Sequence, residues 1–187
     1  MPESAPEPAR ATAGRGATAP SGALPAGVRL ERLRVDHAPA LLAFEVENRA
    51  YFASHISDRG DDYFTEFAAR HAELLADQDA GEIQFHLLVD DDGRVLGRVN
   101  LMDLADGSAE LGYRIAEHAT GRGLATAGVF AVCELAVREY GLQELRAGTN
   151  LTNAASQAVL VRTGFVPVGE ATYGGQPGLT YRRSLTV

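Results

Sequence analysis

The sequence contains no lysine, no tryptophan and only one cysteine, Cys133. A single cysteine excludes an intramolecular disulfide and a cysteine-rich zinc site, and its apolar surroundings predict a core thiol. The five histidines are scattered, with no i, i+4 pair on a helix, so we expect no metal site. No apolar run approaches the ~20 residues that a membrane-spanning helix needs, and no charged-then-apolar leader is found. We therefore expect a cytoplasmic protein.

All seventeen basic side chains are arginines, against 25 acidic ones, for a formal net charge of −8. This balance argues against a protein that binds nucleic-acid phosphates. Residues 58–110 carry fourteen acidic residues and four arginines, whereas residues 111–187 carry five acidic residues and seven arginines. The segregation is compatible with a solvated acidic surface or with two ligands of opposite charge, and the charges alone do not decide between these.

The length of 187 residues favours one domain with a tail. Residues 1–27 hold eight alanines, five prolines and four glycines without apolar periodicity, which predicts a disordered tail. Residues 28–187 would then form the folded domain.

Apolar periodicity predicts strands and helices in the order β-α-α-β-β-β-α-β-α-β-β in that domain. Hairpin turns are expected at Asp91-Asp92-Gly93 and at Asp106-Gly107, and Gly141 and Gly164 are expected to end helices. Strands are predicted at 28–35, 83–89, 95–104, 109–116, 142–149, 166–168 and 179–185. Helices are predicted at 36–51, at 61–76, from the glycine turn at 121–123 to 140, and at 153–162.

The segment Gly121-Arg122-Gly123 joins a predicted strand to a long helix. Glycines allow a sharp turn and a close approach of an anion to the backbone, and the first N–H groups of a helix attract phosphate. The alternative is an ordinary tight turn. The segment lacks the Lys-Ser/Thr of a Walker loop, and Thr126 takes the third glycine position of a dinucleotide motif, so neither nucleotide class is favoured.

Three segments in register resemble the GCN5-related N-acetyltransferase (GNAT) superfamily, and within it the RimJ/RimL-like ribosomal-protein N-acetyltransferases. Ala109–Ile115 resembles the family's fourth strand, and Gly121–Thr126 its pyrophosphate loop. Asn153–Ser156, followed by Gly164-Phe165, resembles its coenzyme-side helix and the start of the next strand. The resemblance covers about residues 28–187.

This resemblance implies an α/β GNAT fold, with a mixed, mostly antiparallel, splayed sheet of about six to seven strands flanked by about four helices. Acetyl-CoA would be the cosubstrate, lying between the fourth and fifth strands. The family has Gln or Arg where this chain has His118. The residues placed against the coenzyme are Tyr113, Arg114, Ile115, His118, Gly121, Arg122, Gly123, Leu124, Ala125, Thr126, Asn153 and Ser156.

Acetyl transfer to an amine requires a neutral amine, a stabilised oxyanion and a proton for the departing thiolate. Glu110 is the candidate base, because family members often carry a glutamate there; the alternative is a residue that ends a turn. The usual proton donor, a tyrosine on the last helix, is replaced by Val161. Ser156 can serve instead, although capping of the helix or contact with the coenzyme also explains it, and water is a further donor.

The family's acceptor pocket would be formed by the first two helices, their loop and the late hairpin. It would include Tyr51, Phe52, His55, Asp58, Arg59, Asp61, Asp62 and Tyr173. Aromatic rings beside carboxylates suit a cationic amine. The leading hypothesis is acetylation of a protein N-terminal α-amine; the others are acetylation of a small-molecule amine, such as an antibiotic or amino-acid derivative, and a non-catalytic CoA-binding module. Either a monomer or a homodimer is compatible with the sequence.

Overall fold

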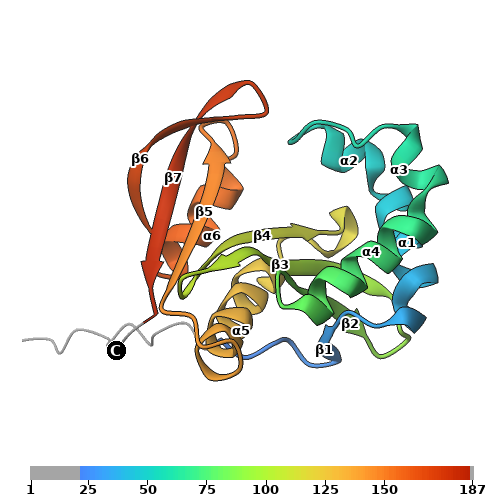
Figure 1. Ribbon diagram of the computed structural model, residues 1–187. Helices are drawn as coiled ribbons and strands as arrows, with labels where there is room; N and C mark the ends of the chain where they lie inside the picture. The colour runs from blue at the N-terminus through green and yellow to red at the C-terminus, as the bar shows by residue number, and fades with distance from the viewer. Residues whose placement is uncertain (1–21, 186–187) are drawn as a thin grey trace, which may run out of the picture.

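The computed structural model describes residues 22–185, so most of the expected tail lies outside the described residues. Strands and helices follow one another in the predicted order (Figure 1). The strands are β1 (Val28–Arg32), β2 (Gln84–Asp90), β3 (Val95–Ala105), β4 (Ser108–Ile115), β5 (Glu144–Asn150), β6 (Val166–Tyr173) and β7 (Gln176–Ser184). The helices are α1 (Ala38–Glu47), α2 (Arg49–Ala53), α3 (Asp61–Thr65), α4 (Phe67–Ala80), α5 (Leu124–Arg138) and α6 (Ala154–Arg162), with 3₁₀ turns η1 (Val35–His37) and η2 (Glu117–Ala119).

The seven strands form one sheet in the order β1-β2-β3-β4-β5-β7-β6. Every neighbouring pair is antiparallel except β4 and β5, which are parallel. These two strands pair only through Ser108, Ala109 and Glu110 of β4, after which they diverge (Figure 1). The sheet is therefore mixed, mostly antiparallel and splayed, as predicted.

Helices cover the two faces of β3 and β4 differently. Val99 of β3 lies beside Gly128 of α5, where a Cβ atom would stand 3.1 Å from the valine side chain. The neighbouring Arg98 instead contacts Glu45 of α1. Because successive side chains of a strand point to opposite faces, α5 packs on one face and α1 on the other.

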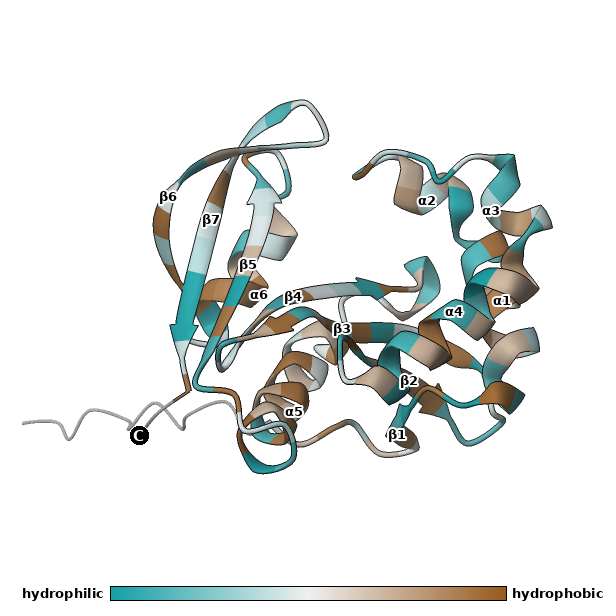
Figure 2. Cartoon of the chain, in the orientation of Figure 1, coloured by the Kyte–Doolittle hydropathy of each residue, from teal (hydrophilic) through white to brown (hydrophobic). Residues whose placement is uncertain are grey.

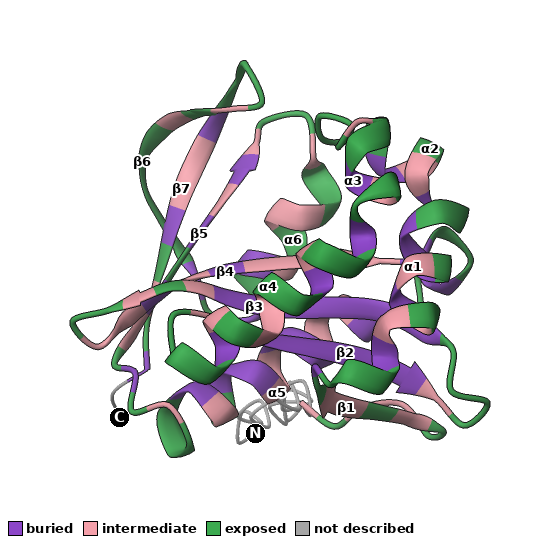
Figure 3. Ribbon diagram, turned by 45° about the vertical axis from the view of Figure 1, so that its right-hand side comes forward, coloured by how far each residue is buried: buried purple, intermediate pink, exposed green. Residues whose placement is uncertain are grey.

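The core lies around the middle of the sheet. The apolar stretches of β2, β3 and α5 gather there (Figure 2), and β2 and most of β3 are buried (Figure 3). Leu87, Leu101 and Val129 are fully buried. Cys133 is also buried, as predicted, and burial raises the pKa of its thiol to about 11.

Each of the two predicted N-terminal helices is broken into two. The first ends at Asn48, whose side chain donates to the Phe44 carbonyl and accepts from the N–H of Glu117, so this residue ties α1 to η2. The second breaks at Glu66 and then continues to Ala80, four residues beyond the predicted end, where Gly81 closes it at a φ of 79°. Tertiary hydrogen bonds and a late glycine set these ends, whereas the apolar pattern runs through the breaks.

The last two strands are longer than predicted. β6 continues past Val168 to Tyr173, and β7 begins at Gln176. β6 is an edge strand with little buried surface, so it lacks the alternating pattern on which the prediction depended. Its length follows from backbone pairing with β7.

The buried His86 gives the stability a pH dependence. Its Nδ1 lies 3.2 Å from the Val99 carbonyl and its Nε2 2.8 Å from the Tyr140 hydroxyl, and burial lowers the pKa of the ring to about 4. The neutral ring is favoured in the folded state, so this contribution is complete above pH ~6.5 and is lost as the pH falls towards 4. We expect the free energy of unfolding to fall by about 3 kcal/mol between pH ~6.5 and pH 4.

Urea unfolding at pH 7, 5.5 and 4 measures this loss. A His86→Gln variant should show a shallower pH dependence, whatever its stability at pH 7. His71, whose pKa burial also lowers, remains in both proteins and contributes equally. Parallel pH profiles for the two proteins would show that His86 is not the responsible group.

Candidate active site

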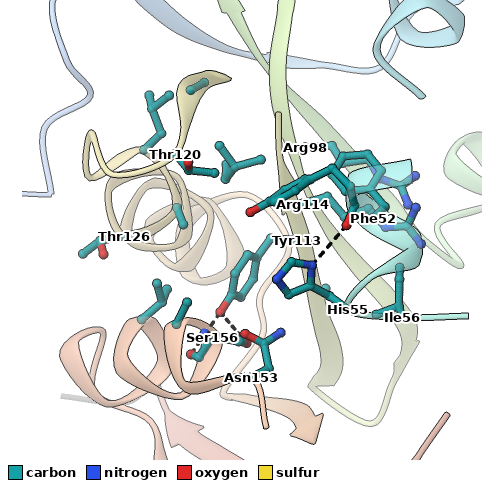
Figure 4. Close-up of a pocket in the computed structure, with 18 of the residues that line it drawn as sticks. Phe52, His55, Ile56, Arg98, Tyr113, Arg114, Thr120, Thr126, Asn153 and Ser156 are labelled. Carbon is teal, nitrogen blue, oxygen red and sulfur yellow. Dashed lines mark hydrogen bonds between the residues drawn. The ribbon is translucent and has the colours of Figure 1, made fainter. Parts of the chain in front are cut away.

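A cavity of about 630 Å³ lies along the free part of β4 and reaches the loop before α5, the first turns of α6 and the side of α2. Figure 4 shows Tyr113 pointing to Ser156 at one end, and Arg98, Arg114 and Phe52 gathered at the other. The cavity therefore joins the predicted coenzyme side of the molecule to the predicted acceptor side.

The glycine turn forms an open end for α5. Gly121 and Gly123 have φ angles of 72° and 76°, which L side chains rarely adopt, and no atom lies within 4 Å of where their Cβ atoms would be. Gly123 is the N-cap residue, and no side chain caps the helix there. The first N–H groups of α5 are thus free to bind a phosphate, so the turn fits the pyrophosphate of a coenzyme.

The edge of β4 that faces away from β3 lacks a strand partner beyond Glu110. The N–H of Ala116 donates to the Leu96 carbonyl, and the direction of backbone groups alternates along a strand. The backbone N–H and C=O groups of Tyr113 and Ile115 therefore point to the free edge, and both residues line the cavity. This edge can bind an extended ligand as a further strand would be bound.

Tyr113 and Ser156 form a hydroxyl pair within the cavity wall. Their oxygens lie 2.9 Å apart, and the Tyr113 hydroxyl also lies 3.2 Å from the Ser156 carbonyl. Burial raises the pKa of Tyr113 to about 12, so the phenol stays protonated. The backbone N–H of Ser156 donates to the Asn153 side chain, which confirms Asn153 as the N-cap of α6 and leaves the serine hydroxyl free for other contacts.

The opposite side of the cavity carries an ionic cluster, which we call the Glu45 cluster. It consists of Glu45, Arg98 and Arg114, which are largely buried, and of Arg59, which is exposed. The Glu45 carboxylate, with 1% of the side chain exposed, lies 3.3 Å from Arg98, 3.3 Å from Arg114 and 3.9 Å from Arg59. Burial, followed by the charges of Arg98 and Arg59, lowers the pKa of Arg114 to about 10, so the guanidinium remains charged at neutral pH.

The structure brings some predicted acceptor residues together and leaves others apart. Tyr51, Phe52 and His55 line the cavity. Asp58 and Asp61 instead bind Arg49, at 2.6 and 2.7 Å, and lie outside the cavity wall. Neither Asp62 nor Tyr173 lines the cavity, and Tyr173 donates to or accepts from Thr180 within the late hairpin.

Some of the predicted coenzyme residues line the cavity and others do not. Gly121, Gly123, Leu124, Ala125, Thr126, Asn153 and Ser156 line the cavity with Tyr113 and Ile115. His118 and Arg122 are exposed and lie outside its wall. The Arg114 side chain turns away from the glycine turn to Glu45 and to the Phe52 ring, whose centroid lies 5.2 Å from the guanidinium carbon.

Glu110 lies within β4 rather than at a turn, opposite Met102 of β3 and Arg146 of β5. Met102 and Gly112 line the cavity, whereas Glu110, two residues before Gly112 on β4, does not. On α6, the cavity is lined by Ala155, Ser156, Val159 and Arg162, and Val161 is 60% exposed on another side of the helix. A tyrosine at position 161 would thus not face the cavity, so the missing donor cannot be assigned to that position.

Sequence reasoning missed Glu45, Arg98 and Asn100. Arg98 and Asn100 alternate with Val99 and Leu101 along a buried strand, and this polar face inside an otherwise apolar segment was a usable signal. Nothing in the spacing of Glu45 on α1 points to the arginines that it contacts.

Residues 28–166 match the family described as the acetyltransferase (GNAT) domain. The chain belongs to this family. The acetyltransferase is 30% identical over 147 residues to the probable N-acetyltransferase YjcK of Bacillus subtilis (strain 168), an alignment that covers 74% of this chain and 80% of that protein.

Two solved structures share its fold. The ribosomal-protein-S5-alanine acetyltransferase from Vibrio fischeri superposes with a TM-score of 0.79 at 18% identity, covering 84% of this chain and 93% of that chain. RimJ from Mycobacterium smegmatis, in complex with CoA-disulfide, superposes with a TM-score of 0.75 at 21% identity, covering 84% and 81%. These findings confirm the predicted GNAT family and acetyl-CoA as the cosubstrate, and they show that RimJ/RimL-type enzymes share its fold.

The chain is therefore an acyl-CoA-dependent N-acetyltransferase. Within residues 22–185 no helix is long and apolar enough to cross a membrane. In the same range, no group of three or more histidine, cysteine, aspartate or glutamate side chains is arranged to hold a metal ion.

Proposed function

We propose that the acetyltransferase transfers the acetyl group of acetyl-CoA to the α-amine at the N-terminus of a polypeptide. Acetyl transfer is supported above all by one continuous cavity, which joins the open end of α5 and the free edge of β4 to the α2 side. A polypeptide acceptor is supported by the rim, because His55 and Ile56 of this wall are exposed and leave room for a chain to continue outward. The Vibrio fischeri enzyme of the same fold is named for such an acceptor.

Each wall of the cavity has a part in this reaction. The N–H groups at the start of α5 bind the pyrophosphate, and the Tyr113 and Ile115 backbone orients the pantetheine arm and the acetyl carbonyl. When bound, acetyl-CoA supplies an activated thioester. Glu110 takes the proton of the acceptor ammonium. The proton passes through a water molecule, because Glu110 does not itself line the cavity.

The hydroxyl of Ser156 passes a proton to the departing thiolate and takes one in turn from the nitrogen of the tetrahedral adduct, which becomes the neutral amide; Tyr113 holds the hydroxyl in place. Ser156→Ala should lower kcat about 10- to 100-fold, within the range for general acids or below it. The helix cap survives this change, because the cap uses the backbone N–H of residue 156. Steady-state kinetics distinguishes the two roles of Ser156: a raised KM for acetyl-CoA with an intact kcat would assign Ser156 to coenzyme contact alone.

Tyr113→Phe, which keeps the serine hydroxyl, should lower kcat less than Ser156→Ala does.

Release of free thiol from acetyl-CoA, measured with a panel of amines, tests the proposed function. The panel contains peptides with free N-termini, the same peptides with blocked N-termini, and small primary amines. We expect the free-N-terminus peptides to give the highest kcat/KM. Small amines that exceed every peptide would establish the small-molecule alternative. Because the chain has no lysine, acetylation of its own ε-amines cannot contribute to the signal.

A further inference from the structure

The Glu45 cluster has more positive charge than its own carboxylate can balance. Three guanidinium groups surround one glutamate, which leaves a formal excess of +2. All three arginines line the cavity, but Arg59 is exposed, whereas only 6% of Arg98 and 18% of the Arg114 side chain are exposed. The largely buried groups Glu45, Arg98 and Arg114 thus carry a formal excess of +1. A buried charge without a partner is costly, so an excess of this kind is expected to be met by a ligand.

The cluster also has unused hydrogen-bonding groups. Each guanidinium has five N–H donors, and Glu45 can accept from only a few of them. Among the described residues, Arg98 Nε, Asn100 Oδ1 and Glu45 Oε1 are buried without a hydrogen-bond partner. Asn100 is 7% exposed and lines the cavity two residues from Arg98 on the same face of β3. The Arg98 Nε–H is a donor that a ligand oxygen would satisfy, whereas the two oxygens are acceptors that need an N–H or O–H group of the ligand.

Aromatic rings hold the guanidinium groups in place. The guanidinium carbons of Arg59, Arg98 and Arg114 lie 4.3, 5.2 and 5.2 Å from ring centroids of Tyr63, Phe85 and Phe52 respectively. Guanidinium groups stacked in this way have restricted side chains, and a fixed planar fork suits a carboxylate or a phosphate.

The coenzyme phosphates do not account for the excess charge. Arg98 and Arg114 project from the face of the sheet that α1 covers, whereas α5, whose first turn fits the pyrophosphate, packs on the other face. The predicted acidic acceptor residues do not offset the charge either, since Asp58 and Asp61 already bind Arg49.

We propose that the Glu45 cluster is an oxyanion subsite, so that the acceptor carries a carboxylate or phosphate group a few bonds from its reactive amine. This inference rests on the proposed acetyl transfer. The oxyanion can belong to an acidic side chain near the N-terminus of a polypeptide or to a small amino acid or aminoalkyl phosphate. The acceptor would then carry an anionic group beside its amine, whereas Asp58, Asp61 and Asp62 suggested recognition of a cationic amine alone.

Binding of inorganic phosphate tests the subsite without any turnover. Saturating CoA first fills the coenzyme end of the cavity, and phosphate is then titrated while the melting temperature is followed. We expect phosphate to raise Tm by a few degrees in the wild type and by much less in Arg114→Gln. Arg138→Gln, which changes an exposed arginine at the end of α5, should behave as the wild type does. Equal shifts in all three proteins, or none in the wild type, would overturn the subsite.

Matched acceptors identify the source of the oxyanion. Each pair differs by one anionic group: a peptide with aspartate against the same peptide with asparagine at its second residue, an amino acid against its amide, and phosphoethanolamine against ethanolamine. We expect the anionic member of the preferred pair to have a kcat/KM about 10- to 100-fold higher, as charged hydrogen bonds allow. Arg114→Gln should reduce this ratio towards one and leave the Kd for CoA unchanged.

Preference for the neutral member of the preferred pair would refute the subsite while leaving acetyl transfer established. A protein that releases no thiol with any amine, yet binds phosphate at Arg114, would refute the proposed transfer and retain the subsite. If Arg114→Gln does not fold, competition settles the question, because phosphate should compete with the acceptor and not with acetyl-CoA.

Discussion

Replacing Glu45 with glutamine is expected to lower the free energy of unfolding by about 3–5 kcal/mol, the range for removing one partner of a buried ionic group. The carboxylate is 1% exposed and is the acidic partner of Arg59, Arg98 and Arg114. Without it, the largely buried guanidinium groups of Arg98 and Arg114 would face each other at low dielectric, with the exposed Arg59 nearby. Arg98 is affected most, because it is itself buried and burial already lowers its pKa.

Urea unfolding of Glu45→Gln and Glu47→Gln measures this effect. Glu47 lies on the same helix but is exposed, so its substitution should change the unfolding free energy by less than about 0.5 kcal/mol. The double variant Glu45→Gln/Arg98→Met, which removes one charge of each sign, should recover part of the loss. Similar stabilities for the two single variants would show that solvent already screens the Glu45 cluster.

The order of strands and helices was predictable because its signals are local. Period-two alternation, hairpin turns and glycines such as Gly123 and Gly141 act over a few residues, and the structure has them where they were expected. The coenzyme end of the site is equally local, since one turn and one helix start form it. The breaks at Asn48 and Glu66 were not predictable, because contacts with distant residues and local backbone geometry set them within continuous apolar patterns.

The charges on the α2 side of the cavity were not predictable, because they come from four separate elements. Glu45 lies on α1, Arg59 in the loop before α3, Arg98 on β3 and Arg114 on β4. A net charge of −8 for the chain therefore coexists with a local excess of +2 in the cavity. Composition describes the whole surface, whereas binding depends on the few charges that the fold places together.

Replacing Glu110 with glutamine is expected to lower kcat at pH 7 about 10²- to 10³-fold, within the range for loss of a general base. The amide has nearly the same shape but cannot take a proton. Glu170→Gln is the matched control, because Glu170 is an exposed carboxylate on the edge strand β6, outside the cavity wall, and its loss should leave kcat unchanged.

The pH dependence separates a base from a residue that only supports β4. Without a base, only the acceptor that is already neutral reacts, so kcat/KM of the variant should rise nearly tenfold per pH unit until the free amine is deprotonated. The rise should level off near pH 8 for a peptide α-amine and near pH 10 for an alkyl amine. A variant with a uniformly reduced kcat/KM and the wild-type pH profile would make Glu110 structural, and an unchanged kcat would remove it from the mechanism.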